Sequence, residues 1–184
     1  MVALIAQADA TLQDNITGLI SAADVRQMIK DFIDTMTPGF GAVGRATQTL
    51  PTLGVAPQVV TYDDTMALTA DFTANLATGE ITRQALGLPT VNNRITFYAG
   101  VEGPAGSEYL FTLFRDGVSV PGGATVSGQG LGNPVQVTFE ILNATPIVGN
   151  PVYKVMASKI SGAAANTNLI DVRFIAEVVP TIGV

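Results

Sequence analysis

Apolar and polar residues alternate with a period of two over much of the chain after residue 57. Three segments show the pattern clearly, with one face formed by Ile95, Phe97, Ala99 and Val101, by Val135, Val137, Phe139 and Ile141, or by Ile170, Val172, Phe174, Ala176 and Val178. Successive side chains of a β-strand point to opposite faces, so each segment predicts a strand with one buried face. About eight such strands separated by turns predict an all-β fold, an antiparallel jelly-roll sandwich over residues 57–184.

One predicted strand, residues 109–114 (YLFTLF), is apolar on both faces. A strand of this kind lies in the core of a sandwich or at a contact between subunits. We therefore predict a homotrimer whose seam contains Tyr109, Leu110, Phe111 and Phe114. Alternation alone leaves open which face of the strand is the core. Asp116-Gly117, which follows this strand, predicts a hairpin turn.

The N-terminal part of the chain contains a segment of helical period. Residues 21–36 (SAADVRQMIKDFIDTM) begin with a good N-cap, Ser21, and are followed by the helix-ending pair Pro38-Gly39. Their apolar face is formed by Val25, Met28, Ile29, Phe32 and Met36. Two interpretations remain open, because one narrow stripe does not hold a short helix alone in water: the helix packs on its own domain, or it docks on a larger body.

The segments on either side of this helix predict no regular structure. Residues 1–20 have no clear period and are interpreted as an extended arm. The stretch 38–57 holds three Pro and four Gly, which predicts a linker over residues 37–56. The expected order is therefore arm, helix, linker and sandwich.

Composition narrows the classes of function. Charged residues make up 13% of the chain, against about 25% in an ordinary soluble domain. So little charge predicts that part of the surface faces another protein. The net charge is −6, which predicts no basic face for nucleic acid. No apolar run is long enough for a membrane-spanning helix, so no membrane partner is expected.

Catalytic chemistry has few candidates in this sequence. Cys and His are both absent, which removes thiolate nucleophiles and the commonest general base. The adjacent Asp63 and Asp64 would point to opposite faces of a strand, and Glu102 and Glu108 flank a glycine-containing loop. We interpret both pairs as solvated, and expect no enzyme activity, no cofactor and no metal site.

Two stretches carry a resemblance to known families. Residues 14–26, DNITGLISAADVR, resemble an N-terminal segment of tailed-bacteriophage virion proteins, in which a DN-x-T-G-x-I-[ST] run leads into a short helix. Residues 72–82, FTANLATGEIT, followed by Tyr109-Leu110-Phe111 and Arg115-Asp116-Gly117, are similar to the jelly roll of tumour necrosis factor and complement globular heads.

The resemblance implies a homotrimeric jelly roll that is a structural part of a phage particle, on its outer surface. The first hypothesis is a capsid decoration (cement) protein that clamps neighbouring subunits of the major capsid protein, or of another virion structural protein. Its N-terminal segment would be the anchor to the particle, through Leu12, Ile16, Leu19, Val25, Ile29, Phe32 and Met36.

The alternative hypothesis is a neck or tail fibre module that binds a host receptor. It predicts aromatic and polar groups on the distal loops, near residues 103–108 or 122–133. Those loops contain no Trp and no Tyr, which weakens the version of this hypothesis in which the receptor is a glycan.

Overall fold

The computed structural model describes residues 25–27, 29, 39–84, 92–143 and 149–179. The chain divides into two units, one formed by residues 1–38 with 180–184 and the other by residues 39–179. In the first unit the described residues 25–27 and 29 are helical, within the helix expected at 21–36. The rest of that helix and the arm expected at 1–20 lie outside the described residues.

The second unit is a β-sandwich. Its described strands are β1 (Phe40–Leu53), β2 (Gln58–Val59), β3 (Asp64–Leu68), β4 (Phe72–Asn75), β5 (Glu80–Arg83), β6 (Asn92–Glu102), β7 (Glu108–Arg115), β8 (Val118–Ser119), β9 (Ala124–Ser127), β10 (Val135–Asn143), β11 (Val152–Ser161) and β12 (Ala165–Val179).

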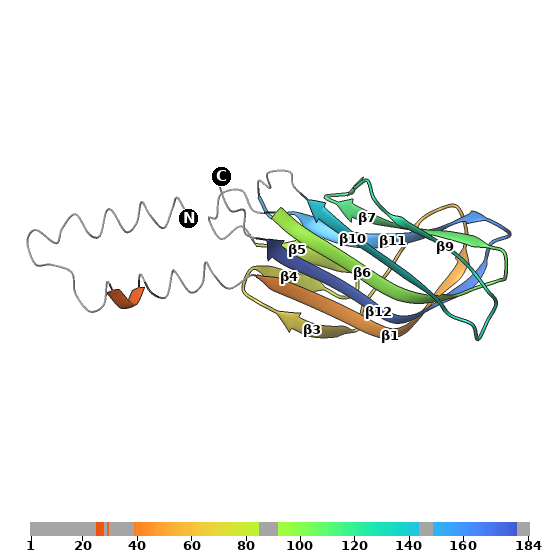
Figure 1. Cartoon of the computed structure of the whole chain (residues 1–184), viewed down its shortest axis with the longest axis horizontal. Helices are drawn as coiled ribbons and strands as arrows, with labels where there is room; N and C mark the ends of the chain where they lie inside the picture. The colour runs from red at the N-terminus through yellow and green to blue at the C-terminus, as the bar shows by residue number, and fades with distance from the viewer. Residues whose placement is uncertain (1–24, 28, 30–38, 85–91, 144–148, 180–184) are drawn as a thin grey trace, which may run out of the picture. The chain divides into compact units, whose positions relative to one another are not determined.

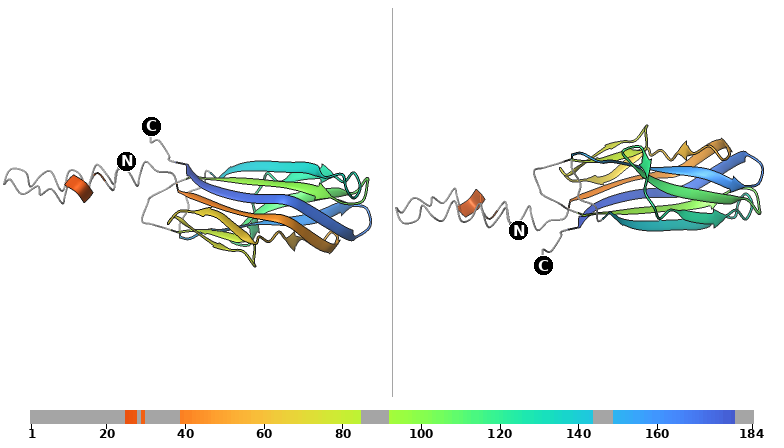
Figure 2. Two further views of the ribbon diagram at one scale, coloured as in Figure 1. Left: turned by 90° about the horizontal axis from the view of Figure 1, so that it is seen from below. Right: turned by 90° about the horizontal axis from the view of Figure 1, so that it is seen from above.

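The strands form two sheets that lie face to face (Figures 1 and 2). The five-stranded sheet has the order β10-β6-β12-β1-β3. The seven-stranded sheet has the order β4-β5-β11-β7-β8, with β2 paired to β11 and β9 paired to β7. Every pairing between described strands is antiparallel. This arrangement confirms the predicted all-β jelly-roll class.

The core lies between the two sheets and is built by the predicted alternation. Ile95, Phe97, Ala99 and Val101 of β6 are completely buried, as the sequence predicted. The ring of Phe97 stacks on those of Phe111 and Phe139 at centroid distances of 5.5 and 5.4 Å. Phe111 belongs to the other sheet, so this stack joins the two layers.

A β-bulge interrupts the alternation of β12. Ile170 pairs with Gly100 and Arg173 with Tyr98, so β12 has one residue more than β6 in this interval. Asp171 takes the extra position with a φ of 48°, in the left-handed region. Leu169 and Val172 both face the core as a result, and Ile170 points outward. The prediction that Ile170 shares the face of Val172 was therefore wrong.

The linker predicted over residues 37–56 is wrong for most of its length, because β1 occupies Phe40–Leu53 between β12 and β3. The glycines of β1 leave room for side chains of neighbouring strands. A Cβ atom on Gly41 would lie 2.9 Å from the Cβ of Phe72, and one on Gly44 would lie 3.0 Å from the Sδ of Met66. The sandwich unit accordingly starts at Gly39 and not near residue 57.

The two ends of the sandwich unit leave from the same end of the sheet. The backbone N–H of Val178 donates to the carbonyl of Gly39 at 2.8 Å, and Val179 pairs with Asn92. We call this the entry end. The opposite end, where Leu53 pairs with Ala165, is the distal end.

The Asp116-Gly117 turn connects β7 and β8 as predicted. Both residues have positive φ, 50° and 81°, as a two-residue hairpin of the primed type requires. The carboxylate of Asp116 also accepts a hydrogen bond of 2.9 Å from the backbone N–H of Val152.

Replacing Gly79 by Ala should lower the free energy of unfolding by about 3 kcal/mol. Gly79 has a φ of 67°, and a Cβ there would lie 2.1 Å from the backbone oxygen of Val60. Gly106 is the matched control, since its φ is 74° but no atom lies within 4 Å of its added Cβ. Gly106→Ala should cost only about 1 kcal/mol. Urea unfolding measures both values, and equal losses would contradict the backbone clash.

The conformation of Asp171 makes a second prediction. Asp171→Val should lower the free energy of unfolding by about 2 kcal/mol, because a β-branched residue is strained at positive φ. Asp171→Gly should change it by less than about 1 kcal/mol, since glycine adopts this φ freely and the lost ion pair is exposed. If both variants unfold at the same urea concentration, the positive φ is not what the bulge requires.

Candidate functional site

The structure describes two of the seven residues expected to anchor the chain. Val25 and Ile29 lie in the helical residues of the first unit and are 40% and 51% exposed. The other five, Leu12, Ile16, Leu19, Phe32 and Met36, lie outside the described residues. Both of these described anchor residues therefore have exposed apolar side chains.

The four residues expected at the trimer seam lie on the two faces of β7. Tyr109 and Phe111 are completely buried in the sandwich core. Assigning these two to a subunit seam was wrong, because a side chain with no exposed surface in one chain cannot contact a second copy. Leu110 and Phe114 point the other way and are half-buried on the outer face of the seven-stranded sheet.

The register of β7 with β11 shows what surrounds Leu110 and Phe114. Leu110 lies opposite Ser158, Thr112 opposite Met156 and Phe114 opposite Lys154. We call this surface the β7–β11 face, formed by Leu110, Thr112, Phe114, Lys154 and Met156. Its cation is neutralised within the chain, because the Nζ of Lys154 lies 3.3 Å from a carboxylate oxygen of Glu80.

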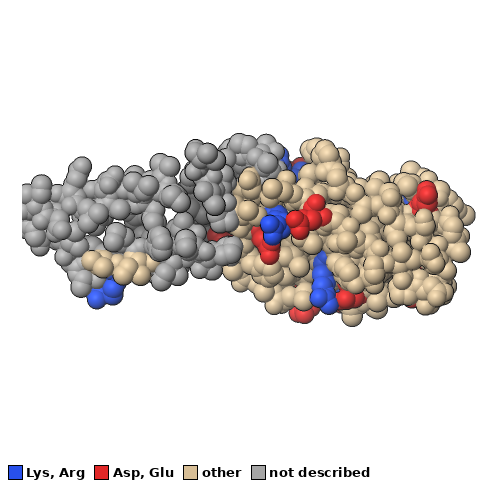
Figure 3. Space-filling model, in the orientation of Figure 1, with Lys and Arg blue, Asp and Glu red and all other residues tan. Residues whose placement is uncertain are grey.

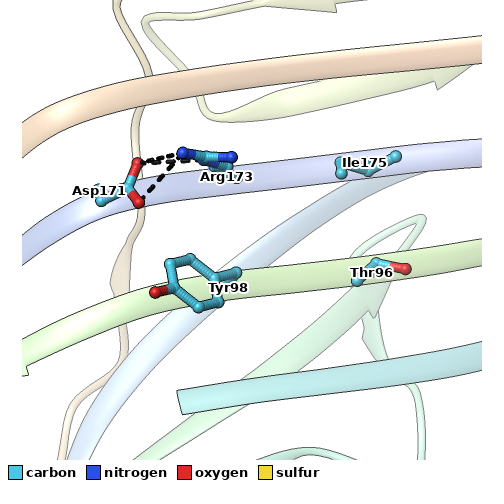
Figure 4. A pocket seen from close by; sticks show the side chains of 5 residues that line it. All are labelled: Thr96, Tyr98, Asp171, Arg173 and Ile175. Atoms are coloured by element: carbon cyan, nitrogen blue, oxygen red, sulfur yellow. Dashed lines mark hydrogen bonds and ion pairs between the residues drawn. The ribbon is translucent and has the colours of Figure 1, made fainter. Parts of the chain in front are cut away.

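The outer face of the five-stranded sheet has a hollow of about 310 Å³ beside the β12 bulge. We call it the Asp171 hollow, lined by Thr96, Tyr98, Asp171, Arg173 and Ile175. Arg173 donates from Nε to one carboxylate oxygen of Asp171 at 3.0 Å and from Nη2 to the other at 3.2 Å. Figure 4 shows the side chain of Tyr98 beside this ion pair. The face of its ring is turned to the viewer, and its hydroxyl lies on the side of Asp171.

A second hollow, of about 280 Å³, adjoins the first across β12 and β1. We call it the Asp63 hollow. It shares Asp171 and Arg173 with the first and adds Gly44, Arg45, Ala46, Asp63, Asp64, Met66 and Val172. The guanidinium of Arg45 lies 3.3 Å from the carboxylate of Asp63 and donates to the hydroxyl of Thr61 at 2.7 Å.

Charged side chains on this side of the molecule gather in separate clusters, with wide uncharged surface between them (Figure 3). One cluster joins three strands: Arg94 of β6 lies 3.5 Å from Glu140 of β10 and 3.6 Å from Glu177 of β12. Because each described cation in these clusters has an acidic partner, the face carries little positive field.

The buried polar groups are held inside the sandwich. At the entry end, Asn93 donates to the hydroxyl of Tyr153 at 2.9 Å, and burial lowers the pKa of Arg83 while Tyr153 and Asp71 oppose that shift. At the distal end, the ammonium of Lys159 bonds to the carbonyl of Ala163 and lies 5.7 Å from the ring centroid of Tyr109. The side chains of Arg83, Asn93, Tyr109, Tyr153 and Lys159 are at most 3% exposed.

Of the acid pairs considered in the sequence, Asp63 and Asp64 both line the Asp63 hollow. Asp63 is paired with Arg45, and both Asp63 and Asp64 are exposed. Glu102 ends β6 and Glu108 begins β7. Among the described residues no three acidic side chains group together as a metal site would require. No helix within the described ranges is long and apolar enough to cross a membrane.

Sequence reasoning did not find the two hollows, because Tyr98, Asp171 and Arg173 come together only through the β6–β12 register. One signal was present in the chain. Leu169 and Ile170 are adjacent apolar residues, and the apolar face resumes at Val172. A shift of phase inside an otherwise regular strand indicates a bulge, and bulges re-aim side chains at surface sites.

Comparison with known proteins finds similar structures and no similar sequences. No protein-family model and no curated protein sequence matches the chain. The globular domain of the zebrafish complement 1qA protein is 15% identical, with 75% of this chain and 94% of that one covered and a TM-score of 0.42. The PRD1 vertex protein P5 is 12% identical, with 77% and 97% covered and a TM-score of 0.50. The likeness to P5 shows that this chain shares its fold.

Proposed function

We propose that this chain is a structural protein of a tailed-phage particle, a homotrimeric decoration protein that attaches to the capsid through residues 1–36. The observation that carries the proposal is the exposure of Val25 and Ile29. The described hydrophobic core lies wholly in residues 39–179, so these apolar side chains are not needed to complete it. Apolar stripes of this kind gain stability by burial on another surface.

Three further observations support the proposal that this chain is part of a phage particle. The segment at residues 14–26 resembles an N-terminal segment of phage virion proteins. A protein that shares the fold, P5, is named as a vertex protein of the phage PRD1. The charged fraction of 13% is half that of an ordinary soluble domain, as expected of a chain covered by neighbours.

The β7–β11 face is the proposed contact between copies. Leu110, Phe114 and Met156 give it apolar area, and its lysine is already paired with Glu80. A contact there would bury apolar surface and leave no cation without a partner.

A neck or tail fibre module remains the alternative. It would use the same sandwich to bind a host receptor, and would be present in fewer copies per particle. Imaging of intact particles separates the two, since hundreds of copies support decoration and a handful supports a fibre or neck part.

Deleting residues 1–36 should leave a soluble trimer with an unchanged β-sheet circular dichroism spectrum that no longer attaches to particles. The reason is that the sandwich keeps its own core. Co-sedimentation with particles that lack the protein measures attachment. Full occupancy by the truncated protein would contradict an N-terminal anchor.

Within the helix, Ile29→Asp should weaken attachment by at least about tenfold, because it places a carboxylate where apolar area is buried. Gln27→Asp is the matched control: it adds the same carboxylate two residues away, at an exposed polar position. If the two variants lose attachment equally, added negative charge and not lost apolar contact explains the result.

The proposed trimer seam predicts different outcomes for substitutions on the two faces of β7. The intact protein should scatter light as three copies of 19.0 kDa. Phe114→Asp should give a folded monomer, because the side chain lies on the outer face. Phe111→Asp should prevent folding, since an unpaired carboxylate in the core costs several kcal/mol. A monomeric intact protein at micromolar concentration would overturn the trimer, and a trimeric Phe114→Asp variant would overturn this seam.

A further inference from the structure

We propose that the Asp171 hollow and the Asp63 hollow together bind a neutral oligosaccharide. The carrying observation is the juxtaposition of a tyrosine ring with two carboxylate–guanidinium pairs, Asp171–Arg173 and Asp63–Arg45, in two hollows that share residues. This proposal goes beyond particle attachment and does not depend on it.

The shape of the surface favours an elongated ligand. The hollows have volumes of about 310 and 280 Å³, each near the lower limit of about 300 Å³ for a ligand site, so a ligand larger than one sugar unit would have to span both. They lie next to each other across β6, β12, β1 and the edge strand β3, with Asp171 and Arg173 between them. A chain of sugar units can occupy both at once.

The hydrogen-bonding groups match hydroxyl-rich ligands. A guanidinium has five N–H donors, and the hydrogen bonds of Arg173 to Asp171 engage its Nε and Nη2. A carboxylate offers about four lone-pair sites. Each pair can therefore donate to one sugar hydroxyl and accept from the next, which suits groups that are donor and acceptor at once.

The charge balance argues against anionic ligands. Arg173 is paired with Asp171 and Arg45 with Asp63, and Asp64 adds a further negative charge to the second hollow. A phosphate or carboxylate ligand would have to displace one of these acids from its arginine. A neutral ligand keeps both ion pairs intact.

The apolar part of the site lies on regular strands. Tyr98 of β6 presents a ring with a polar tip, and Ile175 of β12 adjoins it in the same hollow. The C–H face of a pyranose packs on such a ring. The bulge places Asp171 beside Arg173, and their ion pair is already formed without a ligand, which lowers the entropic cost of binding.

A second copy of this chain is a poorer occupant of the hollows. Their larger apolar groups are Tyr98, Ile175 and Met66, set among paired charges. The β7–β11 face offers Leu110, Phe114 and Met156, and its lysine, Lys154, is paired with Glu80, so it is the better surface for self-association. The two surfaces belong to different sheets.

The test titrates the full-length ¹⁵N-labelled protein with neutral oligosaccharides of one to six hexose units, built from glucose, galactose, mannose or N-acetylglucosamine. At least one series should shift the backbone amides of Tyr98, Asp171 and Arg173. Its longer members should bind more tightly than the monosaccharide. No shift at these residues with any series at millimolar concentration overturns the proposal, and so does a shift confined to other surfaces.

Variants then locate the contact with the oligosaccharide that binds best. Tyr98→Ala and Asp171→Gly should each weaken binding by about tenfold. Asp171→Gly keeps a residue suited to positive φ, so its effect reports the lost carboxylate and not a lost fold. Gln136→Ala is the control, an exposed position of β10 on the same face that does not line either hollow. Unchanged binding by both site variants overturns the proposal.

A further measurement tests the competing occupant. Hydrogen exchange of the edge strand β3 and of β12 around Asp171 is compared between dilute and concentrated protein. Exchange independent of concentration is expected. Protection that grows with oligomerisation would mean that a second copy covers the hollows, and would overturn a sugar site there.

Discussion

The sandwich depends on a single inserted residue in its longest strand. β12 spans 15 residues and lies between β6 and β1 in the five-stranded sheet. A strand with strict period two can bury one set of alternate residues only, and Leu169 and Val172 belong to different sets. The bulge at Asp171 changes the phase between them, so both halves of β12 contribute to one continuous core. As a result two consecutive residues, Ile170 and Asp171, face outward. Both surface hollows are lined by Asp171.

The two outer faces of the sandwich have different physical character. On the seven-stranded sheet, half-buried apolar side chains surround one neutralised lysine, and contact with a protein surface can bury them at little electrostatic cost. On the five-stranded sheet, ion pairs such as Arg94 with Glu140 and Glu177 remain in contact with water. Exposed pairs of this kind add little to stability. Their arrangement therefore matters more for what the face can bind than for how firmly the sheet holds together.

The sequence could predict those features that depend on consecutive residues, and not those that depend on contacts between distant strands. The buried faces of β6 and β10 were predictable, since alternation is a property of consecutive residues and each strand lacks a bulge. β1 was missed because Gly41 and Gly44 resemble linker glycines, and only the neighbouring Phe72 and Met66 show that they make room for packing. The strand around Phe111 was predicted to be apolar on both faces, but choosing the inner face requires knowing which sheet packs above it. The surface hollows depend on the register between two strands far apart in sequence, in which Arg173 pairs with Tyr98, and no local pattern contains that register.

The position of the two chain ends has a consequence for how such a unit can be reused. Gly39 and Val178 are joined by one backbone hydrogen bond, so the sandwich begins and finishes at neighbouring points. A unit of this kind can be placed in a surface loop of an unrelated carrier without stretching either junction, because domain insertion is tolerated where the two ends lie close together. The same geometry leaves the loops of the distal end free to carry grafted peptides away from the carrier. Residues 39–179 thus have the layout of a display cassette, with the point of attachment at one end and the presenting loops at the other.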